Sequence, residues 1–213
     1  MWPFGKAIVN RQTFSLPLFP LSTVLFPGGL LPLKIFEQRY IDMAKTCLKE
    51  GRVFGVCLIT QGTEVAATHE VPVEFAKIGT QARIVDFDMP QLGILHVATR
   101  GETRFQVLNH AVDKAGLITA EVTPIPAEVP LALADEFAPL ANLLELVASR
   151  VGPQNFPVER EYGDPSWVGY RLAELLPLPL HIKQSMLEIN DATVRLKVLQ
   201  QFLVQQGLIP GAL

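Results

Sequence analysis

Two acidic side chains flank an aromatic residue in Asp86-Phe87-Asp88, and their spacing is a pattern that could carry chemistry. Residues two apart in a strand point to the same face of the sheet, so the two carboxylates would lie side by side. Paired carboxylates can act as general acid and general base. The segment lies at the end of an expected hairpin, however, where charged side chains are normally solvated. We therefore expect Asp86 and Asp88 to face water and not to catalyse a reaction.

The histidines are too scattered along the chain to predict a metal site. The zinc-protease pattern HExxH fails, because His69-Glu70 is followed by Val-Pro-Val. His96 lies in the apolar segment ILHVATR, where a structural histidine is much more common than a catalytic one. His181 begins an expected helix, and we expect it to face water. No metal ligand set is predicted.

Nucleophilic chemistry is not predicted either. Lys183 and Ser185 are two residues apart in an expected helix, which places them on different faces and argues against a Ser-Lys dyad. The two cysteines, Cys47 and Cys57, lie in apolar surroundings and are expected to be buried and reduced. No nucleophile elbow or dinucleotide fingerprint occurs. The sequence therefore predicts no catalytic residue and no cofactor.

A long segment without formal charge, residues 12–33, precedes these residues in the chain. A membrane helix, a signal peptide and buried strands are the three alternatives. Four prolines and Gly28-Gly29 interrupt the segment, and an interior proline costs a helix about 3 kcal/mol. The apolar runs between the prolines are too short to span a membrane. We therefore expect extended strands that are buried on both faces, with a turn at Gly28-Gly29.

The first half of the chain reads as a compact β-domain with one helix. The spacing of apolar residues predicts a helix ending at Gly51, and an apolar strand follows it. Two long strands are expected over residues 74–101, joined by a turn at 89–93. Further strands are expected at 103–109 and 117–123, separated from their neighbours by turns at 100–102 and 113–116. Hairpin connections of this kind favour a mainly antiparallel barrel.

The second half, from Pro124 onward, loses the strand pattern and becomes helical. Apolar residues recur at steps of three and four between Leu133 and Val151, with Pro139 marking a kink or a late start. Asp164-Pro165 and Asp191 are typical N-terminal caps of two further helices. We expect a bundle of about four helices. The predicted domains are residues 1–123 and 124–213.

Four segments, in order, resemble the amino-terminal substrate-binding domain of Lon proteases. They begin with LPLFPLSTVLFPGGLLPLKIFEQRYIDM and EFAKIGTQARIVDFDM, and continue with RGETRFQVLN and LAELLPLPLHIKQSMLEINDATVRLKVLQQFL. The resemblance extends from about Ser15 to Leu203. It implies an α+β fold, with a PUA-like antiparallel β pseudo-barrel followed by a small helical bundle. This agrees with the pattern-based prediction.

The resemblance also implies a function. In Lon proteases this domain helps to capture unfolded substrates, and it is followed by an ATPase and a Ser-Lys peptidase that these 213 residues do not contain. We therefore expect a stand-alone, cytoplasmic, non-catalytic module that binds unfolded or partner protein segments. RNA binding is an alternative, because PUA-like barrels often bind RNA, but the net charge of −3 makes nucleic acid an unlikely ligand. A small-molecule enzyme with an unrecognised site is a distant third, and the oligomeric state is left open.

Two groups of residues are candidates for a contact surface. The first group lies at the expected hairpin tip, where an exposed apolar cluster would be a contact site: Phe87, Met89 and Leu92. Packing of this tip on the helical half is the alternative. The second group lies near an acidic loop, between the two halves: Phe156, Trp167 and Tyr170. Ordinary packing between the halves is the alternative there.

Overall fold

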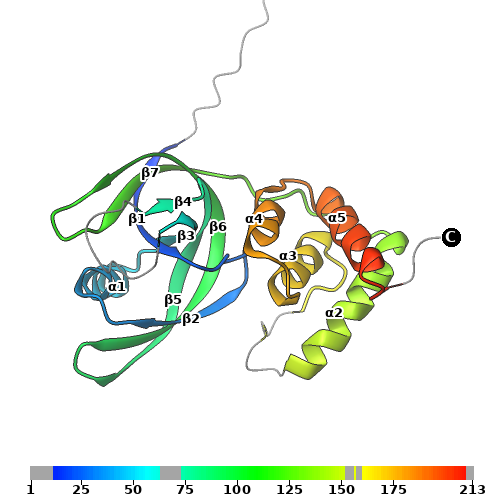
Figure 1. Cartoon of the computed structure of the whole chain (residues 1–213), viewed down its shortest axis with the longest axis horizontal. Coiled ribbons are helices and arrows are strands. Elements are labelled where there is room, and N and C mark those ends of the chain that lie inside the picture. The colour runs from blue at the N-terminus through cyan, green and yellow to red at the C-terminus, as the bar shows by residue number, and fades with distance from the viewer. Residues whose placement is uncertain (1–11, 63–72, 152–155, 157–159, 210–213) are drawn as a thin grey trace, which may run out of the picture.

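The computed structural model describes residues 12–62, 73–151, 156 and 160–209. Figure 1 shows the β-strands and one helix gathered at one end of the molecule, and the remaining helices at the other. The strands are β1 (Phe14–Leu21), β2 (Leu30–Ile35), β3 (Phe54–Gln61), β4 (Glu74–Phe75), β5 (Ile78–Gln91), β6 (Ile94–Val112) and β7 (Ile118–Pro124). The helical turns and helices are α1 (Gln38–Glu50), η1 (Asp135–Phe137), α2 (Ala138–Val151), α3 (Pro165–Leu175), α4 (Leu180–Glu188) and α5 (Ala192–Gln205).

The strands close into a barrel. They follow the order β1-β7-β6-β5-β3, and β3 then pairs in parallel with β1 to complete the circle. The other pairs are antiparallel; β2 is attached to β6, and the two-residue β4 to β3. The predicted α+β class, with a mainly antiparallel barrel, one helix and a helical bundle, is confirmed.

The charge-free segment forms extended chain, as predicted. Its turn is at Gly28, whose φ of 73° favours glycine. The expectation that both of its strands are buried on both faces is wrong for β2, whose residues alternate between more and less exposed. The alternation shows that one face of this strand meets water, and β6 is its one partner among the described strands. Within the described residues, no helix is long and apolar enough to cross a membrane.

The expected turn at residues 100–102 is wrong, because β6 runs without a break from Ile94 to Val112. Gly101 lies inside this strand, and its backbone approaches another segment closely. Its N–H donates to the carbonyl of Gly29 at 2.8 Å, and its own carbonyl accepts from the N–H of Gly28 at 2.8 Å. A glycine in a strand can mark such an approach as well as a turn.

The helix ends follow local signals, as predicted. The Asp164 carboxylate accepts from the Ser166 N–H at the start of α3, and the Asp191 carboxylate accepts from the Val194 N–H at the start of α5. Pro139 lies in the first turn of α2, which is the late start expected from the sequence. Helices α2 to α5 pack around one apolar core, whereas α1 packs on the barrel. Whether residues 1–123 and 124–213 fold independently stays a prediction.

Both cysteines are buried thiols, as predicted. Burial raises the pKa of Cys57 to about 12 and also raises that of Cys47. The thiolate is the reactive form, so we expect each thiol of the native protein to react with Ellman's reagent at pH 8 about a hundredfold more slowly than free cysteine. Both should react at once in denaturant. Rapid labelling of one thiol in the native protein would contradict the buried placement.

Candidate functional site

The β5–β6 hairpin ends in an apolar cluster that faces solvent. Phe87 is 58% exposed, Met89 44% and Leu92 98%, and we call these three residues the hairpin tip. The alternative expectation, that the tip packs on the helical half, is wrong. In Figure 1 the hairpin projects from the barrel at the end away from α2 to α5. The hairpin tip is therefore an apolar surface available to a partner.

The two faces of the hairpin differ in chemistry. Phe87 pairs with Val97, so their side chains share a face, and Val97 belongs to the buried core of the barrel beside α1. On the opposite face, Asp88 pairs with His96. The Asp86 carboxylate accepts a hydrogen bond from the N–H of Phe87 at 2.9 Å. The aspartates are exposed, as expected, and the apolar face continues the barrel core outward.

The other candidate catalytic residues are not brought together. Lys183 donates to the carbonyl of Glu174 at 2.7 Å, whereas the Ser185 hydroxyl donates to the carbonyl of His181 at 3.0 Å. His181 is exposed, as predicted. The pair His69-Glu70 lies outside the described residues. No cluster of three His, Cys, Asp or Glu residues able to hold a metal ion occurs in the described part of the chain.

The three aromatic residues predicted between the two halves differ in how deeply they are buried. Phe156 and Tyr170 are buried, whereas Trp167 is partly exposed. The rings of Phe156 and Tyr162 meet Trp167 edge to face, with centroids 5.6 and 5.2 Å away. The alternative of ordinary packing is thus correct for Phe156. Of the three residues predicted here, Trp167 retains the most surface for a partner.

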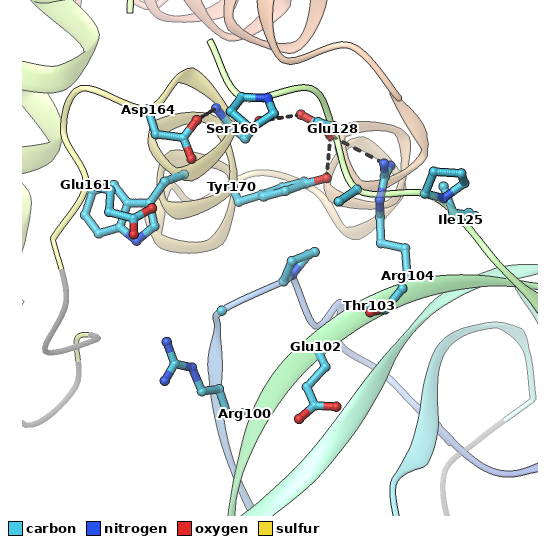
Figure 2. Close-up of a pocket in the computed structure, with 16 residues that line it drawn as sticks. Arg100, Glu102, Thr103, Arg104, Ile125, Glu128, Glu161, Asp164, Ser166 and Tyr170 are labelled. Carbon is cyan, nitrogen blue, oxygen red and sulfur yellow. Dashed lines mark hydrogen bonds and ion pairs between the residues drawn. The ribbon is translucent and has the colours of Figure 1, made fainter. Parts of the chain in front are cut away.

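A groove of about 510 Å³ lies in front of Trp167, between β6 and the start of α3. The segment that connects β7 to the helical half forms part of its wall. We call this cavity the seam groove; Figure 2 shows its polar side chains. Its walls comprise Pro27, Gly28, Arg100, Glu102, Thr103, Arg104, Ile125, Pro126, Ala127, Glu128, Pro130, Glu161, Asp164, Ser166, Trp167 and Tyr170.

A buried carboxylate, Glu128, holds the inner end of the seam groove together. It forms hydrogen-bonded ion contacts with both terminal nitrogens of Arg195, a residue of α5. The hydroxyls of Tyr170 and Ser166 donate to it at 2.6 and 2.7 Å. A second guanidinium, that of Arg104 in β6, lies 3.4 Å from the same carboxylate. The connecting segment is thereby tied to the barrel and to two helices.

The two arginines also join the halves through backbone carbonyls. Arg104 donates to the carbonyls of Leu187 and Ile189, at 2.6 and 3.0 Å. Arg195 donates to the carbonyls of Met186 and Ile189, at 3.0 and 2.6 Å. Because both guanidiniums are almost fully buried, each needs these partners to offset its lost hydration. This network fixes the geometry of the seam groove.

The pKa of Glu128 is set by its buried hydrogen bonds. Burial alone would raise the pKa of Glu128, but the hydrogen bonds from Arg195, Tyr170 and Ser166 outweigh burial and lower it. Burial raises the pKa of Tyr170, and its hydrogen bond to Glu128 acts in the same direction. Glu128 is therefore an anion that the fold has already neutralised, so its charge is not available to a ligand.

Sequence reasoning missed Glu128, Arg104 and Arg195. The one signal for the arginines is that each lies in a segment with several apolar residues, TRFQV and TVRLKVL. This signal is weak, because Lys197 of the second segment is exposed. Glu128 lies in a proline-rich segment that gives no such signal. The pairing of Glu128 with Arg195 joins residues 67 positions apart, which no local pattern reveals.

Comparisons with a family model and with curated proteins both point to Lon proteases. The family model described as the ATP-dependent protease La (LON) substrate-binding domain matches residues 15–205. The chain is 28% identical over 207 residues to a Lon protease of Anaeromyxobacter dehalogenans, and 28% identical over 208 residues to Lon protease 2 of Myxococcus xanthus. Each alignment covers 92% of this chain and 24% of the relative, so the chain spans about a quarter of their length.

Solved structures agree with this assignment. A Lon N-terminal domain protein from Xanthomonas campestris is 38% identical, with a TM-score of 0.70, and the match covers 87% of this chain and 96% of that one. The N-terminal domain of a Mycobacterium avium complex Lon protease is 21% identical, with a TM-score of 0.60 and coverage of 88% and 97%. The second match shows the fold alone.

Proposed function

The chain belongs to the LON substrate-binding domain family, and from this premise we propose that it is a non-catalytic module that binds apolar segments of unfolded proteins. The observation that carries the proposal is the hairpin tip. Its three large apolar side chains are exposed to solvent at the end of the β5–β6 hairpin. Contiguous apolar surface of this kind is typical of protein interaction sites.

The shape of the hairpin supports this role. Met89 and Leu92 lie near or in the turn, and Phe87 lies where the apolar face meets the barrel core. A partner segment can thus bury apolar side chains against the tip while Asp86 and Asp88 remain in water on the opposite face. Burial of apolar surface is non-directional, so such a site accepts many sequences. We also place the protein in the cytoplasm, where buried free cysteines stay reduced.

Removing apolar surface from the hairpin tip tests the proposal. We expect reduced, carboxymethylated α-lactalbumin, which is permanently unfolded, to bind the parent protein at tens of micromolar or tighter. The double variant Met89→Ser and Leu92→Ser should bind at least about tenfold more weakly, because two buried apolar side chains are lost. Isothermal titration calorimetry measures both affinities.

A matched control shows whether binding depends on the hairpin tip or on any exposed apolar side chain. Leu108→Ser makes the same change at another exposed leucine of β6, and binding should be unchanged. No interaction of the parent protein at tens of micromolar would contradict the proposed function. Equal losses in the control and the double variant would remove the tip as the site. Salt-dependent retention on an RNA column, with no binding of unfolded protein, would favour the RNA-binding alternative.

A further inference from the structure

Trp167 lies in the wall of the seam groove beside two carboxylates. Figure 2 shows Glu161 and Asp164 on one wall, with Arg100 and Glu102 on the wall opposite. Glu102 is already bound to Arg83 through both carboxylate oxygens. Glu161, by contrast, is exposed and has no ion-pair partner among the described residues. The wall around Trp167 therefore carries two carboxylates, while the guanidinium of Arg100 belongs to the opposite wall.

Two other aromatic rings in this region lie near a guanidinium. Arg195 lies 3.9 Å from the ring centre of Tyr170, and Arg160 lies 5.9 Å from that of Phe156. In the described part of the chain, Trp167 contacts aromatic edges and no cation. An indole attracts cations more strongly than the other aromatic rings do. The seam groove thus combines a partly exposed indole with two carboxylates on the same wall, and no cation of the described residues stacks on that indole.

The rest of the seam groove suits an extended chain rather than a lone cation. Its remaining walls are largely apolar and include Pro27, Pro126 and Pro130 together with Ile125. Prolines have no N–H to donate, so a chain lying here packs against rings and does not extend a sheet. A volume of about 510 Å³ also exceeds what one side chain fills.

We propose that the seam groove binds an extended protein segment through one arginine side chain, which stacks on Trp167 and pairs with Glu161 and Asp164. Charge complementarity identifies the occupant, because the indole and the carboxylates both favour a planar cation. The seam groove is separate from the hairpin tip. It adds a requirement for a basic residue to the recognition of apolar segments.

Two acetylated and amidated peptides, labelled with the same dye, test this inference. One is Ser-Pro-Val-Arg-Val-Pro-Ser, and the other has citrulline, the neutral isostere, in place of arginine. The chain contains two tryptophans, Trp2 and Trp167, so the variant Trp2→Phe reports on Trp167 alone. We expect the arginine peptide to bind at least about fivefold more tightly by anisotropy, and to change the fluorescence of Trp167. Equal affinities, or binding that leaves Trp167 unchanged, would overturn the proposal.

Charge-neutralising variants locate the contact. Glu161→Gln should bring the arginine peptide close to the affinity of the citrulline peptide, and Asp164→Asn should weaken binding while retaining the N-terminal cap of α3. Glu145→Gln makes the same change on an exposed position of α2, away from the seam groove, and should have no effect. Equal loss in all three variants would overturn the proposal.

The proposed function and this inference can fail separately. If unfolded α-lactalbumin does not bind but the arginine peptide does, the proposed function is wrong and the seam groove site stands. If the double tip variant loses α-lactalbumin but still binds the arginine peptide like the parent protein, the two sites are distinct. Loss of peptide binding in that variant would contradict a separate site.

Discussion

A Glu128→Gln variant is expected to lose about 3–5 kcal/mol of unfolding free energy, because it leaves two buried guanidiniums without their anion. The side chain of Glu128 is 6% exposed, and those of Arg104 and Arg195 are almost fully buried. Glutamine keeps the size of the side chain and removes its charge. The arginines would retain their carbonyl partners, but a carbonyl does not neutralise a cation.

Urea unfolding followed by circular dichroism and by fluorescence measures this loss, and agreement of the two probes checks two-state behaviour. Glu102→Gln is the matched control, because Glu102 pairs with an arginine at the surface, where an ion pair contributes about 0–1 kcal/mol. Equal losses in the two variants would contradict the role of Glu128 as the anion that joins the halves.

The pH dependence of the same variant has a definite sign. The pKa of Glu128 is lowered from its ordinary value of 4.5, so its contribution to stability is fully present above that value. The contribution is lost as the pH falls through the lower pKa of the folded state. The stability difference between the parent protein and Glu128→Gln should thus be constant above about pH 5 and shrink at more acidic pH.

Local signals made much of the fold predictable from the sequence. The caps Asp164 and Asp191, and the glycine that ends α1, act within a few residues of their own position. The prolines of residues 12–33 exclude a helix by the same local sterics. Strand alternation and turn residues then led to the antiparallel barrel, because hairpins join neighbours in the chain.

The hairpin tip and the seam groove differ in how far the sequence could reveal them. The tip is a local feature: Phe87, Met89 and Leu92 surround a turn, and charged neighbours mark that turn as exposed. The seam groove is formed by the turn before β2, by β6, by the segment that connects β7 to the helical half, and by α3. Its residues come together only after the two halves pack, and no short-range pattern encodes that step.

Gly101 shows most clearly where local reasoning fails. The segment Arg100-Gly101-Glu102 has the composition of a turn, yet it continues β6. The glycine is needed because the turn at Gly28 and Gly29 is hydrogen-bonded to it from across the structure. A turn favours glycine, and so does a strand position that another backbone segment approaches closely. The sequence alone does not distinguish the two.

Gly101→Ala is expected to be the second severe variant, with a loss of about 3–5 kcal/mol of unfolding free energy. A Cβ atom at this position would lie 2.2 Å from the carbonyl oxygen of Phe26, and a backbone atom cannot rotate away as a side chain can. The turn would have to move and would lose both of its hydrogen bonds to Gly101. Urea unfolding measures the change.

Gly163→Ala is the control, because no atom lies within 4 Å of a Cβ atom there. It should change stability by less than about 1 kcal/mol, and the sign should be favourable, since alanine restricts the unfolded chain. Equal unfolding free energies of the Gly101→Ala and parent proteins would contradict the prediction, because the turn would then shift at no cost in stability.

Hydrogen exchange adds a readout that a general loss of stability would not produce. The turn also joins the halves, because Arg171 of α3 donates to the carbonyl of Pro27 at 2.9 Å. Displacing the turn should therefore release the amides of Gly28 and Gly101 and loosen α3 against the barrel, while the amides inside α5 keep their relative protection. Uniform loss of protection along the chain would mean that the substitution lowers the global stability only, and would contradict a specific role of this turn in joining α3 to the barrel.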